Sequence, residues 1–303
     1  MHAWEQIQKT LDYIEEHLDG ALSPEGLAAV ACLSPFYYQR LFSRLVKKPV
    51  AEYVRLRRMA RAAEALRDGD QRILDVALSL GFSSHGHFTR TFKDTFGMTP
   101  DEYRGDPRPL NRMTKPELLL HYTLVDEGVP LVTDGIVLEV SRRRLDAPVP
   151  CLGLERRMPA SFVEGLGTQS GEDPLDGLWR DFHARKAAIP GLMEDSPEIG
   201  VTHPCGRADQ FCYFAGGEAV AGTGAGADCA VWTLPQGTYI VCSFEAECFE
   251  ALVMDALYKA LQYLYGAWLP GHGVRTEPFC AERYAGHSPE TSRMELWLKC
   301  VEK

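Results

Sequence analysis

Two stretches of the chain, 50 residues apart, carry polar side chains of the same type at matched places. Arg40 and Arg90 occupy the same position in the two stretches, and Gln39 precedes the first arginine. An arginine guanidinium can donate two parallel hydrogen bonds to O6 and N7 of guanine, and a glutamine amide can pair in the same way with adenine. These side chains therefore have the chemistry to read base edges in a DNA groove.

The elements that must position these side chains form an internal repeat, because residues 34–53 return in register at 84–103. The matched positions are Ser34/Ser84, Arg40/Arg90, Phe42/Phe92, Glu52/Glu102 and Tyr53/Tyr103, with Ala31 and Gly81 as the small residues three positions before each serine. A short helix, a turn, a serine that can N-cap and a second helix with an aromatic face make up a helix-turn-helix. The repeat predicts two such units, joined by a long helix over about Val50–Arg67. Its length of ~27 Å would let one chain place two reading helices in successive major-groove segments.

Positive charge is concentrated in the same region. Residues 40–61 hold eight basic residues and one acidic residue, whereas the whole chain has a net charge of −10. We expect this basic stretch to contact phosphates; the alternative is a solvated helix face whose arginines pair with nearby acids. Residues 1–108 contain 15 basic and 15 acidic residues, so residues 109–303 carry the whole net negative charge. We do not expect that acidic part to bind DNA.

Residues 73–104, ILDVALSLGFSSHGHFTRTFKDTFGMTPDEYR, resemble the DNA-binding domain of the AraC/XylS family of bacterial transcription regulators, and residues 27–59 resemble its more variable first unit. The resemblance implies an all-α tandem helix-turn-helix domain over residues 1–108, with double-stranded promoter DNA and RNA polymerase as partners. By position it implies base contacts from Phe36, Gln39 and Arg40 in the first reading helix, and from His85, Gly86, Thr89 and Arg90 in the second. Gly86 has no side chain, so we expect weaker direct readout from the second helix. The phosphate contacts that we expect are Arg44, Lys47, Arg57, Arg58 and Lys93.

After a connector over residues 109–134, residues 135–303 predict an α+β domain with an antiparallel sheet and two helices. The order strand, strand, helix, strand, strand occurs twice, which predicts a duplicated unit. The expected elements are strands 136–145 and 149–157, helix 174–188, and strands 197–203 and 210–218, then strands 229–235 and 237–245, helix 249–265, and strands 279–284 and 292–301. The glycine-rich stretch 216–228 between the halves lacks a P-loop lysine, so we expect a loop and no nucleotide site.

The segments VWTLPQGTYIVCSFEAE, ALYKALQYLYGAWLPGHGV, FCAERY and SRMELWLKCVEK resemble a GyrI-like small-molecule-binding domain. The resemblance implies a cleft for apolar or cationic organic effectors, with Glu295 of the last strand pointing into it. Alternation in that strand places Glu295 and Trp297 on one face, where a carboxylate beside a π face suits a cation. The alternative is a plain strand with Glu295 paired to an arginine or lysine. Further wall candidates are Tyr213, Trp232, Tyr239, Trp268 and Tyr284.

Composition bounds the remaining possibilities. No run approaches the ~20 apolar residues that span a bilayer, and the first residues lack the pattern of a secretory signal, so we expect a cytoplasmic protein that does not bind membranes. The nine cysteines include no CxxC pair. We interpret them as structural, with a redox sensor or a zinc site as alternatives, and we expect no metal and no cofactor.

We therefore favour a regulator that senses an effector, including multidrug sensing, and is not an enzyme. The alternative is a GyrI-like hydrolase or a drug-sequestering protein that acts on a reactive small molecule. A Glu295 carboxyl whose pKa the neighbouring Trp297 raises would serve as its general acid or base.

Overall fold

The computed structural model describes residues 3–133, 136–165, 170–193, 197–222, 229–287 and 292–301. The chain divides into two compact units, each with its own core. The first unit runs to Tyr122 and includes a short strand, β5 (Gly171–Glu172), and the second unit holds the other described residues. Within the described ranges, no helix combines the length and the apolar character needed to cross a membrane.

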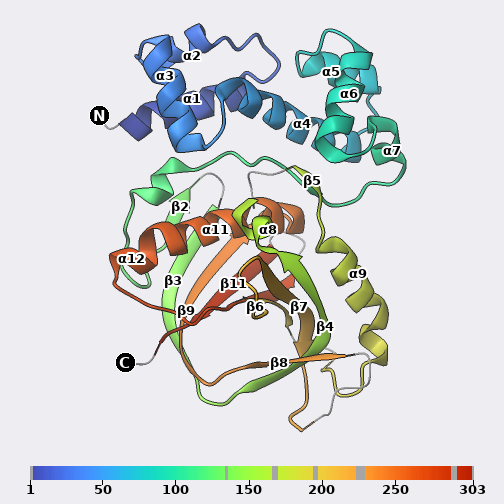
Figure 1. Cartoon of the computed structure of the whole chain (residues 1–303), viewed down its shortest axis with the longest axis vertical. Helices are drawn as coiled ribbons and strands as arrows, with labels where there is room; N and C mark the ends of the chain where they lie inside the picture. Colours follow the sequence, from blue (N-terminus) through green and yellow to red (C-terminus); the bar gives the residue numbers. More distant parts are fainter. Residues whose placement is uncertain are drawn as a thin grey trace. The chain divides into compact units, whose positions relative to one another are not determined.

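Helices build the first unit (Figure 1). They are α1 (Ala3–Glu16), α2 (Pro24–Val30), α3 (Pro35–Val46), α4 (Val50–Asp68), α5 (Ile73–Ser79), α6 (His85–Phe96) and α7 (Pro100–Gly105). α4 spans two cores: Tyr53 in its first half packs with α1 to α3, whereas Ala63 in its second half packs with α5 to α7. Its 19 residues give a rod of about 28 Å. The sequence therefore predicted the all-helical architecture and the joining helix.

Serine caps begin both reading helices, α3 and α6. The Oγ atoms of Ser34 and Ser84 accept hydrogen bonds from the backbone N–H three residues further on, at 3.4 and 3.3 Å. Lys47 and Gly97 follow the two helices in left-handed conformations, with φ of 61° and 83°. The 50-residue repeat therefore extends to the backbone that starts and ends each helix.

The turns before the two reading helices differ in length. Cys32 and Gly81 take the left-handed position, with φ of 55° and 74°, and the next backbone N–H in each turn donates to the carbonyl five residues earlier, at 2.9 and 3.0 Å. Cys32 is thus the structural equivalent of Gly81, and the expected match of Ala31 with Gly81 is wrong. The reason is that Ser83 adds one residue to the second turn, so the offset there is 49.

The segment after α7 lies on the first unit. Strand β1 (Leu110–Asn111) pairs with β5, while Met113 and Leu118 pack into the core formed by α1 to α4. A 3-10 turn over Leu118–His121 follows. Residues 110–121, which we expected to be connector, therefore contribute to the cores of the helical unit.

A long antiparallel sheet organises the second unit (Figure 1). Its strands run in the order β2-β3-β9-β11-β10-β6-β7-β4-β8. Their bounds are β2 (Leu131–Thr133), β3 (Ile136–Leu145), β4 (Val149–Pro159), β6 (Glu198–Pro204), β7 (Gln210–Glu218), β8 (Ala230–Leu234), β9 (Gly237–Ala246), β10 (Cys280–His287) and β11 (Ser292–Lys299). The sequence predicted this α+β class with an antiparallel sheet.

The helices of this unit are α8 (Ala160–Gly165), α9 (Asp176–Arg185) with a 3-10 turn over Lys186–Ala188, and a long helical segment. That segment contains α10 (Phe249–Ala251), α11 (Leu257–Tyr263) and α12 (Leu269–Gly271), with π-helical turns over Leu252–Ala256 and Leu264–Trp268 between them. Part of the predicted glycine-rich loop, residues 223–228, lies outside the described residues.

The two faces of the sheet carry different cores. On β7, Tyr213 packs with Leu178 of α9, whereas its neighbour Phe214 packs with Trp297 and other side chains of the opposite face. Successive residues of a strand point to opposite faces, so each side chain can be assigned to one of them. We call these the helix face and the inner face.

Candidate functional sites

The first reading helix, α3, has a buried side and an exposed side. Tyr38 and Phe42 are fully buried in the core, whereas Phe36 is 68 % exposed. Gln39 and Arg40 are also exposed. The three base-reading residues expected in this helix therefore reach solvent, and the aromatic ring of Phe36 could contact a thymine methyl group.

The second reading helix, α6, presents His85, Gly86 and Arg90 to solvent. Thr89 differs, because its hydroxyl oxygen is shielded from solvent and has no hydrogen-bond partner among the described residues. The threonine side chain would have to rotate about χ1 before its hydroxyl could meet a base. Of the base contacts expected from this helix, the one from Thr89 would need a rearrangement, whereas His85 and Arg90 are already exposed.

The two reading helices belong to one compact unit, and Figure 1 shows α3 and α6 at opposite ends of α4. The rod of about 28 Å between them is close to the ~34 Å repeat of the duplex. One chain thus carries two exposed reading helices on a single scaffold. This is the arrangement that a dimeric helix-turn-helix repressor obtains from two subunits.

The expected phosphate contacts separate into two groups. Arg44, Lys47 and Lys93 are exposed and can meet phosphate oxygens. Arg57 is only 8 % exposed; its Nε and Nη2 donate to the Glu15 carboxylate at 2.7 and 2.8 Å, and its Nη1 donates to a backbone carbonyl. The prediction that Arg57 contacts phosphate is wrong, because its guanidinium is used inside the protein.

Burial and pairing with Arg57 have opposite effects on the pKa of Glu15. Burial alone would raise the pKa of Glu15, but the hydrogen bonds and charge of Arg57, with the charge of Arg61, outweigh it and lower that pKa. The alternative that arginines of the basic stretch pair with nearby acids thus holds for Arg57 and Arg61, and Lys48 likewise pairs with Glu52 at 3.1 Å. Within the described ranges, no ion pair of this kind involves Arg40, Arg44 or Arg90 on the exposed sides of α3 and α6.

Arg58 is held by the backbone that follows α1. Its Nε donates to the carbonyl of Leu18 at 2.9 Å, and its Nη2 donates to the carbonyl of Gly20 at 2.6 Å. The side chain is half-buried. Replacing Arg58 would therefore disturb the fold as well as any phosphate contact, so it cannot report on DNA binding alone.

In the second unit, the Glu295 carboxylate is already paired with side chains of the sheet. Its Oε1 accepts from Arg143 Nη1 at 2.9 Å and from Ser243 Oγ at 3.3 Å, and its Oε2 accepts from Trp297 Nε1 at 2.9 Å. Arg283 lies over the Trp297 ring at 5.0 Å. Two arginines therefore already occupy the place of a cationic ligand, which favours the alternative of a paired strand residue.

The pKa of Glu295 moves in the direction opposite to the one that we expected. Burial raises it, but the hydrogen bonds from Trp297 and Arg143 and the charges of Arg143 and Arg283 outweigh burial, so the pKa is lowered. An ionised carboxylate cannot act as a general acid, and one with a lowered pKa and both oxygens hydrogen-bonded is a weak general base. The hydrolase alternative therefore loses the residue on which it relied.

The aromatic wall candidates separate onto the two faces of the sheet. Trp232, Tyr239 and Trp297 lie in the core of the inner face, whereas Tyr213 and Tyr284 lie on the helix face. Trp268 lies in the long helical segment, 1 % exposed and stacked on His272 at 4.1 Å. These seven expected effector residues, counting Glu295, do not form one site.

A different carboxylate, which the sequence reasoning missed, gathers the tyrosines of the helix face. Glu282 on β10 is 8 % exposed, and its Oε2 accepts hydrogen bonds from Tyr213 at 2.8 Å and Tyr284 at 3.1 Å. The Tyr284 ring meets Trp179 of α9 at 5.2 Å and Phe249 of α10 at 6.1 Å. We call these five residues the Glu282 cluster.

The Glu282 cluster has a definite proton arrangement. Burial first, and then the charge of Glu282, hold the pKa of Tyr213 well above its usual value of 10. The hydroxyl therefore keeps its proton and donates a hydrogen bond to the carboxylate. Gly200 on the neighbouring strand makes room for this bond, because a Cβ there would overlap the Tyr213 hydroxyl. The available sequence signal was the alternation in strand 279–284, which places Glu282 and Tyr284 on one face.

Comparison with known proteins divides the chain in a similar way. Residues 27–106 match a family described as a helix-turn-helix domain, and residues 153–300 match the GyrI-like small molecule binding domain. Regulatory protein SoxS of Salmonella typhimurium is 37 % identical over 98 residues, which are 32 % of this chain and 92 % of that protein.

Two further relatives are longer than the region they share with this chain. Transcriptional regulator Rob of Salmonella typhimurium is 36 % identical over 197 residues, 64 % of this chain and 63 % of Rob. The uncharacterized HTH-type transcriptional regulator YbfP of Bacillus subtilis is 44 % identical over 104 residues, 34 % of this chain and 35 % of YbfP. The chain thus spans about a third of YbfP and less than two thirds of Rob.

Proposed function

We propose that this chain, which belongs to the AraC/XylS family of transcription regulators and carries a GyrI-like domain, reads promoter DNA with α3 and α6 and responds to a small organic effector through its second unit. The observation that carries the first half is the pair of exposed reading helices at the two ends of α4, each with an arginine at the same position of the repeat.

In this proposal the side chains of the reading helices have separate tasks. Arg40, Gln39 and Arg90 read base edges, where two parallel hydrogen bonds discriminate between bases. Arg44 and Lys93 contact phosphates, which adds affinity but no sequence preference. Phe36 and His85 complete the reading faces as expected from their positions, and Lys47 extends the phosphate contacts.

Binding sites selected from random duplexes, followed by titrations at several salt concentrations, test this division. Arg40→Ala and Arg90→Ala should each cost about 1–3 kcal/mol on the selected site and less on random DNA. Arg44→Ala should weaken both DNAs alike and reduce the salt slope by about 0.9. Equal losses on the two DNAs in all three variants would refute the assignment of readers.

The Glu282 cluster supports the second half of the proposal better than Glu295 does. A buried carboxylate bordered by Trp179, Tyr284 and Phe249 offers a charge and π faces to a cation with apolar bulk. Two tyrosine hydroxyls fix the orientation of that carboxylate. We therefore propose that the effector is an amphipathic organic cation and that it binds at this cluster, between α9 and the start of the long helical segment.

The strand order supports the predicted duplication and the central place of Glu282. From β3 to β8 the order reads β3-β9-β11-β10-β6-β7-β4-β8. The first half contributes β3, β4, β6 and β7, and the second half contributes β8, β9, β10 and β11 in the same sequence order. When each strand is replaced by its counterpart (β3 by β8, β4 by β9, β6 by β10 and β7 by β11, and the reverse), the same strand order results, read from the other edge of the sheet. The third strands of the two halves, β6 and β10, meet at the centre, and Glu282 lies on β10.

Calorimetry on the full chain with a matched cationic and neutral compound tests the effector site. Glu282→Gln keeps the shape of the side chain and removes its charge. It should therefore lower the affinity for the cationic compound at least tenfold and leave the affinity for the neutral compound nearly unchanged. Glu295→Gln is the control and should affect neither. If only Glu295→Gln lowered the affinity for the cationic compound, the effector site would lie on the inner face instead.

The alternative of a hydrolase would also use Glu282, since a carboxylate beside tyrosine hydroxyls is the arrangement that such chemistry needs. Sensing is favoured because the relatives are transcription regulators. Product formation from a strained electrophile, abolished in Glu282→Gln, would support the hydrolase instead. As a regulator, the chain would act in the cytoplasm at promoters, with RNA polymerase as its partner.

A further inference from the structure

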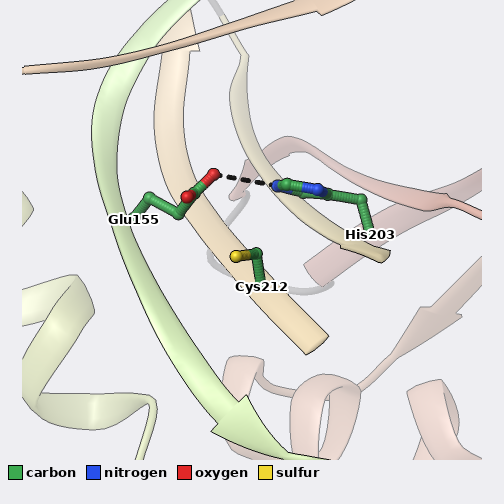
Figure 2. Close-up of side chains that lie close together, drawn as sticks. All are labelled: Glu155, His203 and Cys212. Carbon is green, nitrogen blue, oxygen red and sulfur yellow. Dashed lines mark hydrogen bonds and ion pairs between the residues drawn. The ribbon is translucent and has the colours of Figure 1, made fainter. Parts of the chain in front are cut away.

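Three side chains with metal-binding atoms converge on the inner face of the sheet, one from each of the strands β4, β6 and β7. Figure 2 shows Glu155, His203 and Cys212 pointing toward one another. One ligand atom from each lies within 4.8 Å of the other two. Strand pairing brings them together, since His203 is opposite Cys212 on β6 and β7, and β4 flanks β7 on its other side.

We propose that Glu155, His203 and Cys212 bind a zinc ion. A thiolate, an imidazole and a carboxylate are the ligands that Zn²⁺ takes in proteins, and three protein ligands with a fourth open position form a common zinc geometry. Thiolate and imidazole together also disfavour the hard ions Mg²⁺ and Ca²⁺, which prefer oxygen ligands.

The distances between the ligand atoms suit a site that needs only small side-chain shifts. Tetrahedral bonds of about 2.0 to 2.3 Å place ligand atoms about 3.3 to 3.6 Å apart. His203 Nε2 and Glu155 Oε2 are 2.9 Å apart, so they would separate by about 0.4 Å around the ion. Cys212 Sγ lies within 4.8 Å of both and would move closer. Shifts of about 1 Å in these three side chains would therefore complete the coordination.

The surroundings of His203 orient it as a ligand. Its Nδ1 lies 3.2 Å from the backbone carbonyl of Pro204, and its ring stacks on Trp232 with centroids 4.5 Å apart. This contact holds the ring so that Nε2 faces Glu155, 2.9 Å from its Oε2. An outer hydrogen bond of this kind is typical of metal-bound histidines.

The softest ligand of the proposed site, the Cys212 sulfur, is buried, whereas the carboxylate ligand is partly exposed. Cys212 is 4 % exposed, while the Glu155 side chain is 37 % exposed and leaves a path for the ion to enter. Water can occupy the fourth position, as it does in open zinc sites. The interpretation of all cysteines as structural is revised here for Cys212.

Titration of the reduced full chain with Co²⁺, followed by competition with Zn²⁺, tests the proposal. The wild-type chain should bind one Co²⁺ with a thiolate-to-cobalt charge-transfer band in the near ultraviolet, and Zn²⁺ should abolish that band. Cys212→Ser should lose the band. Glu155→Gln and His203→Asn should keep part of it but bind at least tenfold more weakly.

Cys248→Ser is the matched control, because Cys248 is an exposed thiol of the same unit, and its serine replacement should bind the metal like wild type. Near-ultraviolet circular dichroism of each variant without metal checks that the unit remains folded. A wild-type chain without the band, or a band that survives in Cys212→Ser and disappears in Cys248→Ser, would overturn the proposal.

Discussion

Replacing Arg57 tests whether this arginine stabilises the fold or contacts DNA. The Arg57 and Glu15 side chains are each 10 % exposed, and they share two hydrogen bonds of 2.7 and 2.8 Å. Arg57→Met keeps most of the apolar length of the side chain but leaves the Glu15 carboxylate buried without this partner. Removing one member of a buried ion pair costs about 3–5 kcal/mol, a large part of the 5–15 kcal/mol that stabilises a typical domain.

Hydrogen exchange of backbone amides in α4 measures this loss within the intact chain. A cost of about 3 kcal/mol lowers protection by about a hundredfold, because each 1.4 kcal/mol is a factor of ten. Glu15→Gln combined with Arg57→Met should recover part of the loss, since no uncompensated charge then remains. The exposed Arg44→Ala variant is the control and should leave exchange unchanged.

The pH dependence follows from the lowered pKa of Glu15. A carboxyl with a pKa below its usual value of 4.5 stabilises the folded state above that pH and loses this contribution as the pH falls through the folded-state pKa. The protection difference between wild type and the double variant should therefore shrink in acid. If Arg57→Met instead kept full protection and reduced only the salt slope of DNA binding, the structural role would be refuted.

Three further substitutions test the local geometry. Cys32→Gly removes the steric cost of a left-handed residue and should stabilise the helical unit by about 0.5–1 kcal/mol in denaturant unfolding; destabilisation would contradict the assigned turn. Ser84→Ala removes the N-cap of α6 and should cost about 1 kcal/mol, and an unchanged midpoint would show that this cap is not used. Gly200→Ala should displace the Tyr213 hydroxyl from Glu282 and destabilise the second unit by about 1–3 kcal/mol, whereas Gly86→Ala, where a Cβ meets open space, should not destabilise the chain.

Local rules predicted the helical unit well. The serine caps and the aromatic stripes through Phe42 and Phe92 depend on residues three or four positions apart, so a short stretch of sequence specifies them. The 50-residue repeat then shows that the same unit occurs twice. The turn at Cys32 was misjudged because a left-handed residue other than glycine has no clear sequence signature. Arg57 was misjudged because its partner, Glu15, is 42 residues away.

In the second unit, sequence patterns predicted which face a side chain lies on but not which other side chains it contacts. Alternation placed Glu295 and Trp297 on one face correctly, but it could not show that Arg143 lies beside them, since β3 joins that region only through β9. Glu282 and the triad of Glu155, His203 and Cys212 depend likewise on strands that are distant in sequence. Sheet order, which no short motif specifies, decides which side chains meet.

The mass of the protein–DNA complex tests most directly whether one chain reads DNA with two helices. Native mass spectrometry of the full chain on a selected duplex should give one chain per duplex, and a footprint should cover roughly 20 base pairs on one face. Arg40→Ala and Arg90→Ala should each reduce protection over one half of that footprint. Two chains per duplex with strict dependence on a palindromic site would contradict the account, because each chain would then need only one of its reading helices.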